Sequence, residues 1–516
     1  MTEKATHSKH ARAGMLMAVA TFAMAAAAAI QAALYLHSNG TDALTDGFFV
    51  AFSLYTVFGV FSQSIRVTSA PLLVHPTRAL PLREFGATLV FIALAVAALT
   101  VPLAHPLSVA LAPGLSDAGR SVTEEALPIL GGAMILQLWA AGGATVLAVR
   151  DRFDAVAGAY IAGAGAGLLT YLVSSGGAGE LSLAYSMLAM AVVTCTLMLI
   201  AVRRSQPAEP AAPARPLRLR LLIADAGLIL GRTSIYLAFN ALYLVTLALT
   251  TSYAPGDATV LSYAYLFASY LVAGTAFALG MSRIADMSRE VRTDELKAVG
   301  GTVPQGFRYS ILICAPALAA FVAAGAPIIG VAFSASFDSG DVRILQEFGA
   351  LLAVWTVAAL LVNLLLPAMF ALGRARFTNL LTPALIAVHV AASLLGGALF
   401  GAVGVVGAAF VAPLLFAATM LRVGAPSIAG HLARETSRDA LRFLLLAGGC
   451  YGLGAALGAA LGSTLIGATV AGTLGSVLYL ALLPLVAPSQ VDVVLRALPL
   501  GFLKSRRRAT PAAPAA

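Results

Sequence analysis

Two charged residues lie inside the same long apolar stretch, and their types point to anion chemistry. Arg232 falls near the middle of LILGRTSIYLAFN, and Asp225 precedes it by seven residues, two helical turns on one helix face. A guanidinium group binds phosphate oxygens through two parallel hydrogen bonds, so Arg232 is a candidate ligand for an anionic headgroup. The alternative is a structural ion pair, but seven residues separate the two charges by about 10 Å along the axis. Asp225 is then expected to meet lipid headgroups or the preceding basic segment.

Uncharged polar residues interrupt other apolar stretches. Gln137, Asn363 and His389 are candidates for lining a cavity or for coupling transport to an ion, since imidazole titrates near neutral pH. The simpler interpretation is that each makes an interhelical hydrogen bond, which is the common role of such residues in membranes. Both interpretations stay open at this point.

The sequence predicts neither a metal site nor a cofactor. All three cysteines fall inside apolar stretches, so a disulfide framework and a cysteine metal cluster are excluded. There is no Walker-type glycine loop. The longest loop on the side opposite the basic loops carries Asp117, Glu124 and Glu125, without the polar domain that a membrane glycosyltransferase would need. We therefore do not expect an enzyme.

The elements that position these residues are membrane-spanning helices. Of the 516 residues, 60% are hydrophobic and only 11% are charged, whereas soluble domains carry about 25% charged residues. A span needs about 20 apolar residues. Fourteen stretches qualify, and the protein is therefore predicted to be an all-α polytopic membrane protein. The expected spans are 13–36, 46–65, 85–104, 126–149, 153–173, 181–202, 221–250, 258–282, 306–334, 345–370, 377–398, 402–422, 440–461 and 465–487.

The basic residues fall almost entirely on one side of these spans. The N-terminus, the even-numbered connections and the C-terminal tail hold 29 of the 32 lysines and arginines, and the other side holds Arg120 and Arg343. Cytoplasmic loops are enriched in basic residues, which predicts that both termini are cytoplasmic. The net charge of +9 is then a matter of topology, and no nucleic-acid partner is expected.

The chain reads as a duplicated six-helix unit. Local patterns recur at separations of 221 to 224 residues, including RDRF at 150–153 and RARF at 374–377, and Pro106 and Pro327. Repeats of six helices share one orientation, and two such halves can alternate access to a site near the midplane. The predicted organisation is a bundle 1–202, a linker 203–220, a second bundle 221–422, two further helices within 440–487 and a tail 488–516.

Two segments carry a family resemblance. The stretch TDGFFVAF, with Asp46, is followed by FSQ at 61–63, and Asn240 is followed by LSYAYLF at 261–267. Together they resemble the MviN or MurJ type of lipid II flippase, in the multidrug/oligosaccharidyl-lipid/polysaccharide exporter superfamily. The resemblance implies a V-shaped bundle and marks Asp46 and Asn240 as candidate substrate-binding positions. In the family an arginine follows the Tyr-Ala pair, where this chain has Leu266, and the first span has no charge between Arg12 and Asp42.

The leading hypothesis is a flippase or exporter of a polyprenyl-pyrophosphate-linked oligosaccharide, or of a peptidoglycan or polysaccharide precursor. It would act in the bacterial cytoplasmic membrane, on a lipid-linked anionic substrate, among membrane lipids and cell-envelope biosynthesis proteins. One alternative is a cation-coupled multidrug exporter, although such antiporters need buried carboxylates and few are present. The other alternative is a non-transporting envelope scaffold.

Overall fold

The structure is a computed structural model of the chain. It describes residues 30–74, 81–205, 218–277, 295–332 and 339–488 apart from positions 151, 373, 425, 427, 428, 462 and 463, together with scattered residues at 20–28 and residue 279. The described residues are helical and contain no strand, as expected for a chain whose backbone polar groups must be satisfied within the bilayer. Twelve of their helices are long and apolar enough to cross a membrane, which confirms an all-α polytopic protein.

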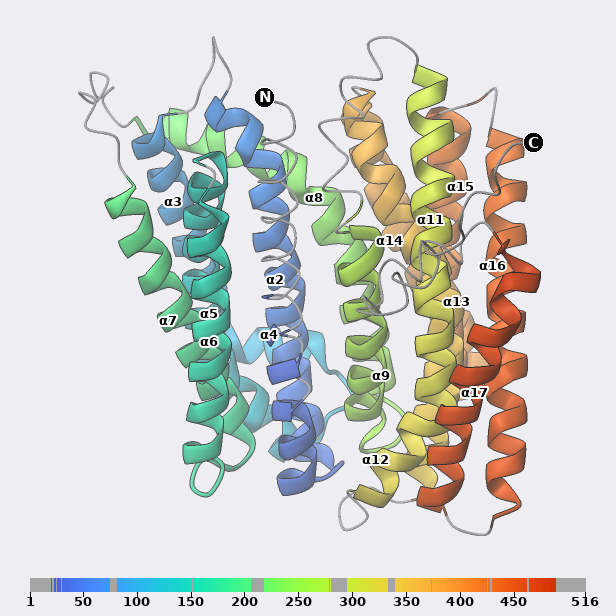
Figure 1. The fold of residues 1–516 in the computed structure, drawn as a ribbon. Coiled ribbons are helices and arrows are strands. Elements are labelled where there is room, and N and C mark those ends of the chain that lie inside the picture. Colours follow the sequence, from blue (N-terminus) through green and yellow to red (C-terminus); the bar gives the residue numbers. More distant parts are fainter. Residues whose placement is uncertain are drawn as a thin grey trace, which may run out of the picture.

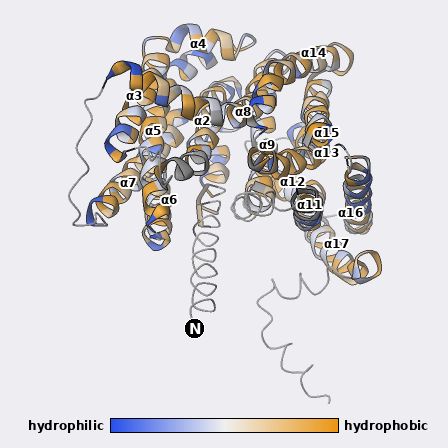
Figure 2. Ribbon diagram, turned by 90° about the horizontal axis from the view of Figure 1, so that it is seen from above, coloured by the Kyte–Doolittle hydropathy of each residue, from blue (hydrophilic) through white to orange (hydrophobic). Residues whose placement is uncertain are grey.

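The described helices form two groups that stand side by side (Figures 1 and 2). We call α2–α7 the N-terminal half and α8–α15 the C-terminal half, and α16 and α17 lie against the latter. The N-terminal half consists of α2 (Ala43–Val74), α3 (Leu82–Thr100), α4 (Ala104–Leu111), α5 (Asp117–Val149), α6 (Phe153–Ser174) and α7 (Ser182–Arg204). The C-terminal half consists of α8 (Leu219–Thr250), α9 (Asp257–Val272), α11 (Glu295–Ala320), α12 (Ala326–Ala332), α13 (Ser339–Ala371), α14 (Ala375–Ala408) and α15 (Val411–Gly424). The remaining two helices are α16 (Ala429–Ala459) and α17 (Thr464–Val486).

Each half contains a short helix in front of a long one. In the N-terminal half α4, with Pro106, precedes the 33-residue α5. In the C-terminal half α12, with Pro327, precedes the 33-residue α13. Pro106 lies in the first turn of α4, where the missing N–H of proline would be unpaired anyway. Pro327 is the second residue of α12, which the π-helical turn Phe321–Gly325 joins to α11. The two prolines that recur in the sequence therefore occupy the same place in the order of helices.

Of the fourteen expected spans, two are not among the twelve long helices. The first, 13–36, lies partly outside the described residues, which include its last seven positions, 30–36. The other, 402–422, follows Gly401, whose φ of 63° and ψ of −147° break the helix written as Ala375–Ala408. Only glycine adopts this backbone region readily. Gly401 therefore separates two spans, and the second of them continues as the shorter α15.

Helix α8 packs on both halves along its length. Its first part contributes Ala226 and Ile229 to a buried cluster with residues of α2, α3 and α5. Its second part contributes Ile235, Tyr236 and Phe239 to the large core of the C-terminal half. Figure 1 shows α8 crossing obliquely from one half to the other. Arg232 lies on α8 where the packing changes from the first cluster to the second.

Candidate functional site

Asp46 lies in the first turn of α2 and is the most completely bonded acidic residue of the candidate set. Its side chain is buried, with 2% of the residue exposed. One carboxylate oxygen accepts a hydrogen bond from the backbone N–H of Gly256 at 2.7 Å. The other accepts from the N–H of Thr259 at 2.8 Å and from its hydroxyl at 2.7 Å. Asp46 therefore joins the N-terminal half to the start of α9 in the C-terminal half, and we call this contact the Asp46 latch.

The reason for this geometry is the way α9 begins. Its N-cap residue is Gly256, which has a φ of 93° and no side chain to accept the first free N–H groups. Helix N-termini leave such donors unpaired and carry partial positive charge. The carboxylate of Asp46 takes the place of the missing cap from across the interface. The sequence motif TDGFF thus supplies a capping group to a helix more than 200 residues away.

Further contacts between the halves lie at the same end of the bundle. The hydroxyl of Thr41 donates to a carboxylate oxygen of Asp341, at the start of α13, at 2.9 Å. Gly114, in the turn between α4 and α5, approaches the α8–α9 turn so closely that an added Cβ would lie 2.3 Å from the Thr251 carbonyl oxygen. The backbone of the two halves is therefore in direct contact at this end.

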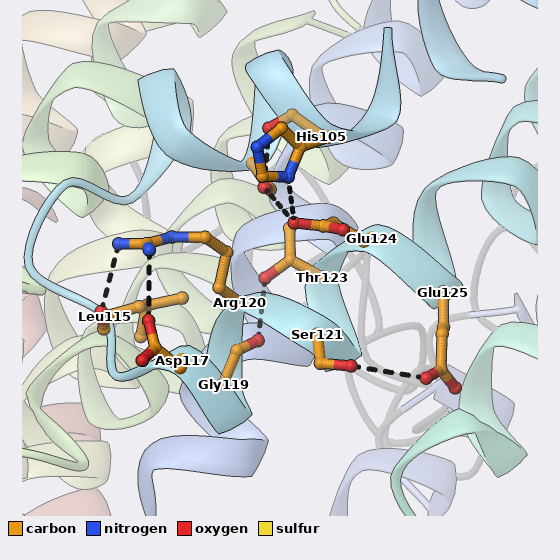
Figure 3. A network of polar contacts seen from close by, with 10 residues as sticks. His105, Leu115, Asp117, Gly119, Arg120, Ser121, Thr123, Glu124 and Glu125 are labelled. Carbon is orange, nitrogen blue, oxygen red and sulfur yellow. Dashed lines mark hydrogen bonds and ion pairs between the residues drawn. The ribbon is translucent and has the colours of Figure 1, made fainter. Parts of the chain in front are cut away.

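Polar contacts between α4 and α5, which Figure 3 shows, fix these two helices on either side of the turn that contains Gly114. His105 and Ser108 of α4 both contact one carboxylate oxygen of Glu124, at 2.8 and 3.1 Å. The preceding residue, Thr123, donates its hydroxyl to the Gly47 carbonyl of α2 at 2.8 Å. The three acidic residues expected in a loop, Asp117, Glu124 and Glu125, instead lie on α5, where Glu124 fastens α4 to α5. Among the described residues no group of three or more potential ligands forms a metal site.

At the other end of the bundle, the described hydrogen bonds of Arg150 and Arg374 stay within one half. We call it the basic end, because most of the loop arginines lie there. Arg150 donates to the Val202 carbonyl and the Ser205 hydroxyl. Arg374 contacts the Val423 carbonyl. These contacts link segments within each half and do not link one half to the other.

The predicted residue Arg232 lies on α8, but its side chain is outside the described residues. The backbone beside it is tightly held. The amide of Asn379, on α14, donates to the Gly231 carbonyl at 2.6 Å, and the Ser234 hydroxyl donates to the Asn379 side-chain oxygen at 3.2 Å. Sequence reasoning missed Asn379, although it stands just after the recurring RARF motif. Asp225 lies nearer the basic end of α8 and is partly exposed.

The other predicted polar residues make separate, local contacts. Asn240 and Asn363 each donate to the carbonyl four residues earlier in their own helix, at 2.8 and 2.9 Å. Gln137 donates to the Tyr55 hydroxyl at 2.8 Å, which joins α5 to α2. His389 is 1% exposed, and its Nε2 lies 3.0 Å from the Thr246 hydroxyl of α8. Their hydrogen bonds do not connect any of the four to Asp46.

The fold and these contacts define a class: a membrane transporter built from two helical halves. The family model described as lipid II flippase MurJ matches residues 32–460, so this chain belongs to the MurJ lipid II flippase family. Members of this family are transporters rather than catalysts. No curated protein matches the chain significantly.

Solved structures show the same fold at low sequence identity. A lipid II flippase MurJ in an inward closed conformation is 13% identical, with a TM-score of 0.69, and the match covers 93% of this chain and 100% of that one. An inward-facing multidrug resistance transporter of the MATE family is 13% identical, with a TM-score of 0.59, covering 81% and 99%. A MATE transporter of Vibrio cholerae is 13% identical, with a TM-score of 0.56, covering 82% and 97%.

Proposed function

We propose that this protein is a flippase for a polyprenyl-pyrophosphate-linked envelope precursor, in the bacterial cytoplasmic membrane with both termini in the cytoplasm. Membership of the MurJ family supports the choice of substrate class. The observation that carries the mechanism is the Asp46 latch, which joins the two halves at the end opposite the basic loops. Because cytoplasmic loops are basic, the latched end faces outward and the basic end faces the cytoplasm.

In this account the latch sets which side of the membrane has access. With Asp46 capping α9, the outer ends of α2 and α9 are held together, and the headgroup enters from the cytoplasmic side. Outward release requires the halves to rock and the three hydrogen bonds of Asp46 to break. Each bond to a charged group contributes about 1.5–3 kcal/mol, so substrate binding must favour the outward state by a comparable amount.

Arg232 is the proposed ligand for the pyrophosphate. It lies where α8 passes from packing on the N-terminal half to packing on the C-terminal half. A residue at that point changes its neighbours when the two halves move against each other. A residue that binds the headgroup in one state and releases it in the other needs such a change. In this scheme Asn240 lies two turns further along α8 as a second polar contact, Asp225 meets the headgroup region, and Gln137, Asn363 and His389 remain candidates for cavity lining or coupling.

A specific observation favours one alternative over the other. His389 is buried against Thr246, and no described residue forms a hydrogen bond with its Nδ1 atom. Such a group suits a proton-coupled exporter better than an inert scaffold. The multidrug exporter is therefore the second candidate.

The test is to deplete the protein and to quantify polyprenyl-pyrophosphate intermediates on each membrane face by mass spectrometry. A flippase predicts that one intermediate accumulates on the cytoplasmic face. Unchanged pools together with sensitivity to toxic cations would instead support the multidrug exporter. Unchanged pools without such sensitivity would support the scaffold.

A further inference from the structure

Helix α16 carries a basic stripe on the face turned away from the protein. The stripe consists of His431, Arg434, Arg438 and Arg442, which are all exposed and recur every three or four residues. This spacing places them on one side of a helix. The opposite side is buried and includes Leu432, Thr436, Asp439 and Phe443. Figure 2 shows α16 at the rim of the C-terminal half, with hydrophilic residues on its ribbon.

The inner side of α16 is fixed to α11 by ion pairs. The guanidinium of Arg308 contacts Asp439 at 2.7 Å through Nε and Glu435 at 2.7 Å through Nη2. Both acidic groups are thereby engaged with a residue on the protein side, although the second oxygen of Glu435 also lies 3.7 Å from His431. These ion pairs hold the first turns of α16 in one orientation, so that the basic stripe faces away from the protein.

The three arginines of the stripe form no ion pair among the residues that the structure describes. The only side-chain bond of Arg434 goes to the carbonyl of Gly430, in its own helix, at 3.2 Å. Three full positive charges therefore face outward from a helix whose acidic residues are already paired.

The depth of the stripe matches the headgroup layer of a bilayer. Below Arg442 the same face continues as exposed leucines, including Leu445, Leu453 and Leu457. The apolar part from Phe443 to Ala459 is about 26 Å long, close to the thickness of a hydrocarbon core of about 30 Å. Arg442 and Arg438 then stand at the level of lipid phosphates, with Arg434 about one turn above.

We propose that this stripe binds the headgroups of anionic phospholipids in the leaflet at the basic end. Charge complementarity and continuity with the lipid-facing leucines both point to a lipid surface rather than to another protein. Arginine is suited to this contact, because its guanidinium group binds phosphate oxygens in a planar, two-bond geometry. The site holds resident lipid on α16 and is separate from the proposed substrate ligand on α8.

The test measures binding of phosphatidylglycerol and phosphatidylcholine to the purified full-length protein by native mass spectrometry. The variant replaces Arg434, Arg438 and Arg442 together by Gln. A matched control replaces the exposed Arg203, Arg204 and Arg218 by Gln, which removes the same charge at the same end of the bundle. A third variant replaces the stripe arginines by Lys, which keeps the charge.

We expect the wild type to prefer phosphatidylglycerol and the stripe Gln variant to lose at least about tenfold of that preference, since each basic residue near a membrane surface is worth about fivefold. The control and the Lys variant should retain most of it, and their melting temperatures show that the variants are folded. Equal loss in stripe and control variants, or an unchanged preference in the stripe Gln variant, would overturn the proposal.

Discussion

At the scale of single residues, the central group is the carboxylate of Asp46. It accepts three hydrogen bonds from the start of α9 and is buried from water. Replacing a buried acceptor of this kind costs free energy, because its N–H and O–H partners would lose their hydrogen bonds without gaining bonds to water. The resemblance of the TDGFFVAF segment to the flippase family marked Asp46 as a candidate substrate-binding position. The sequence could not select Gly256 and Thr259, because one sequence contains no signal that pairs residues this far apart.

Replacing Asp46 by Asn should weaken the latch, because the amide nitrogen would present a donor to N–H groups that are themselves donors. We expect outward transport to fall at least about tenfold, because losing about one charged hydrogen bond lowers by that factor the population of the latched state, which takes up substrate from the cytoplasm. The measurement is the rate at which precursor appears on the outer face of cells that depend on the variant. Asp117→Asn is the matched control, since Asp117 lies at the same end with its side chain fully exposed. Equal rates for Asp46→Asn and wild type would argue against a role for the latch.

Replacing Arg232 by Ala should reduce transport by at least about tenfold, because a bidentate contact to phosphate contributes about 1.5–3 kcal/mol. Arg232→Lys should keep part of the activity, since the charge remains but the planar geometry is lost. The same transport assay checks both variants, with protein level as the control for folding. Full transport activity of the Ala variant would remove Arg232 from the substrate site.

At the scale of elements, the spans and most of their ends follow from local patterns. Apolar length and the placement of arginines predicted the order of helices, and Gly401 lies between two spans that were expected to end at 398 and to begin at 402. The oblique course of α8 was not predictable, because the apolar residues on its faces give no sign of which neighbouring helix each part contacts. For the same reason the role of Asn379 in holding α8 to α14 was missed.

Replacing Gly401 by Ala should destabilise the break at Gly401 inside α14, where one span ends and the next begins. The backbone there has a φ of 63° and a ψ of −147°, a region that costs other residues about 1–3 kcal/mol. We expect a lower melting temperature in detergent, measured by thermal unfolding. Gly407→Ala serves as the comparison, since an added Cβ there meets Leu351 only at ordinary contact distance. A melting temperature of Gly401→Ala equal to that of Gly407→Ala would show that the strain is absorbed elsewhere.

At the scale of the whole molecule, hydrogen bonds of Asp46 and Thr41 join the two halves at the outer end, while the described bonds of Arg150 and Arg374 at the basic end stay within their own halves. The sequence indicated two halves through its recurring motifs, and from these it predicted alternating access. The sequence could not show whether the molecule is open to the outside or to the cytoplasm, since both states contain the same helices. Contacts between residues far apart in the chain, such as Thr41 with Asp341, distinguish the states.

The most direct test of this account is a reversible cross-link across the outer end. Thr41→Cys and Asp341→Cys, introduced together, place two thiols where the native side chains are in hydrogen-bond contact at 2.9 Å. The three native cysteines are buried and do not compete readily. Oxidation should stop outward transport, reduction should restore it, and each single variant should be insensitive to both. Transport that continues at the full rate with the disulfide formed would contradict the claim that the outer end must open.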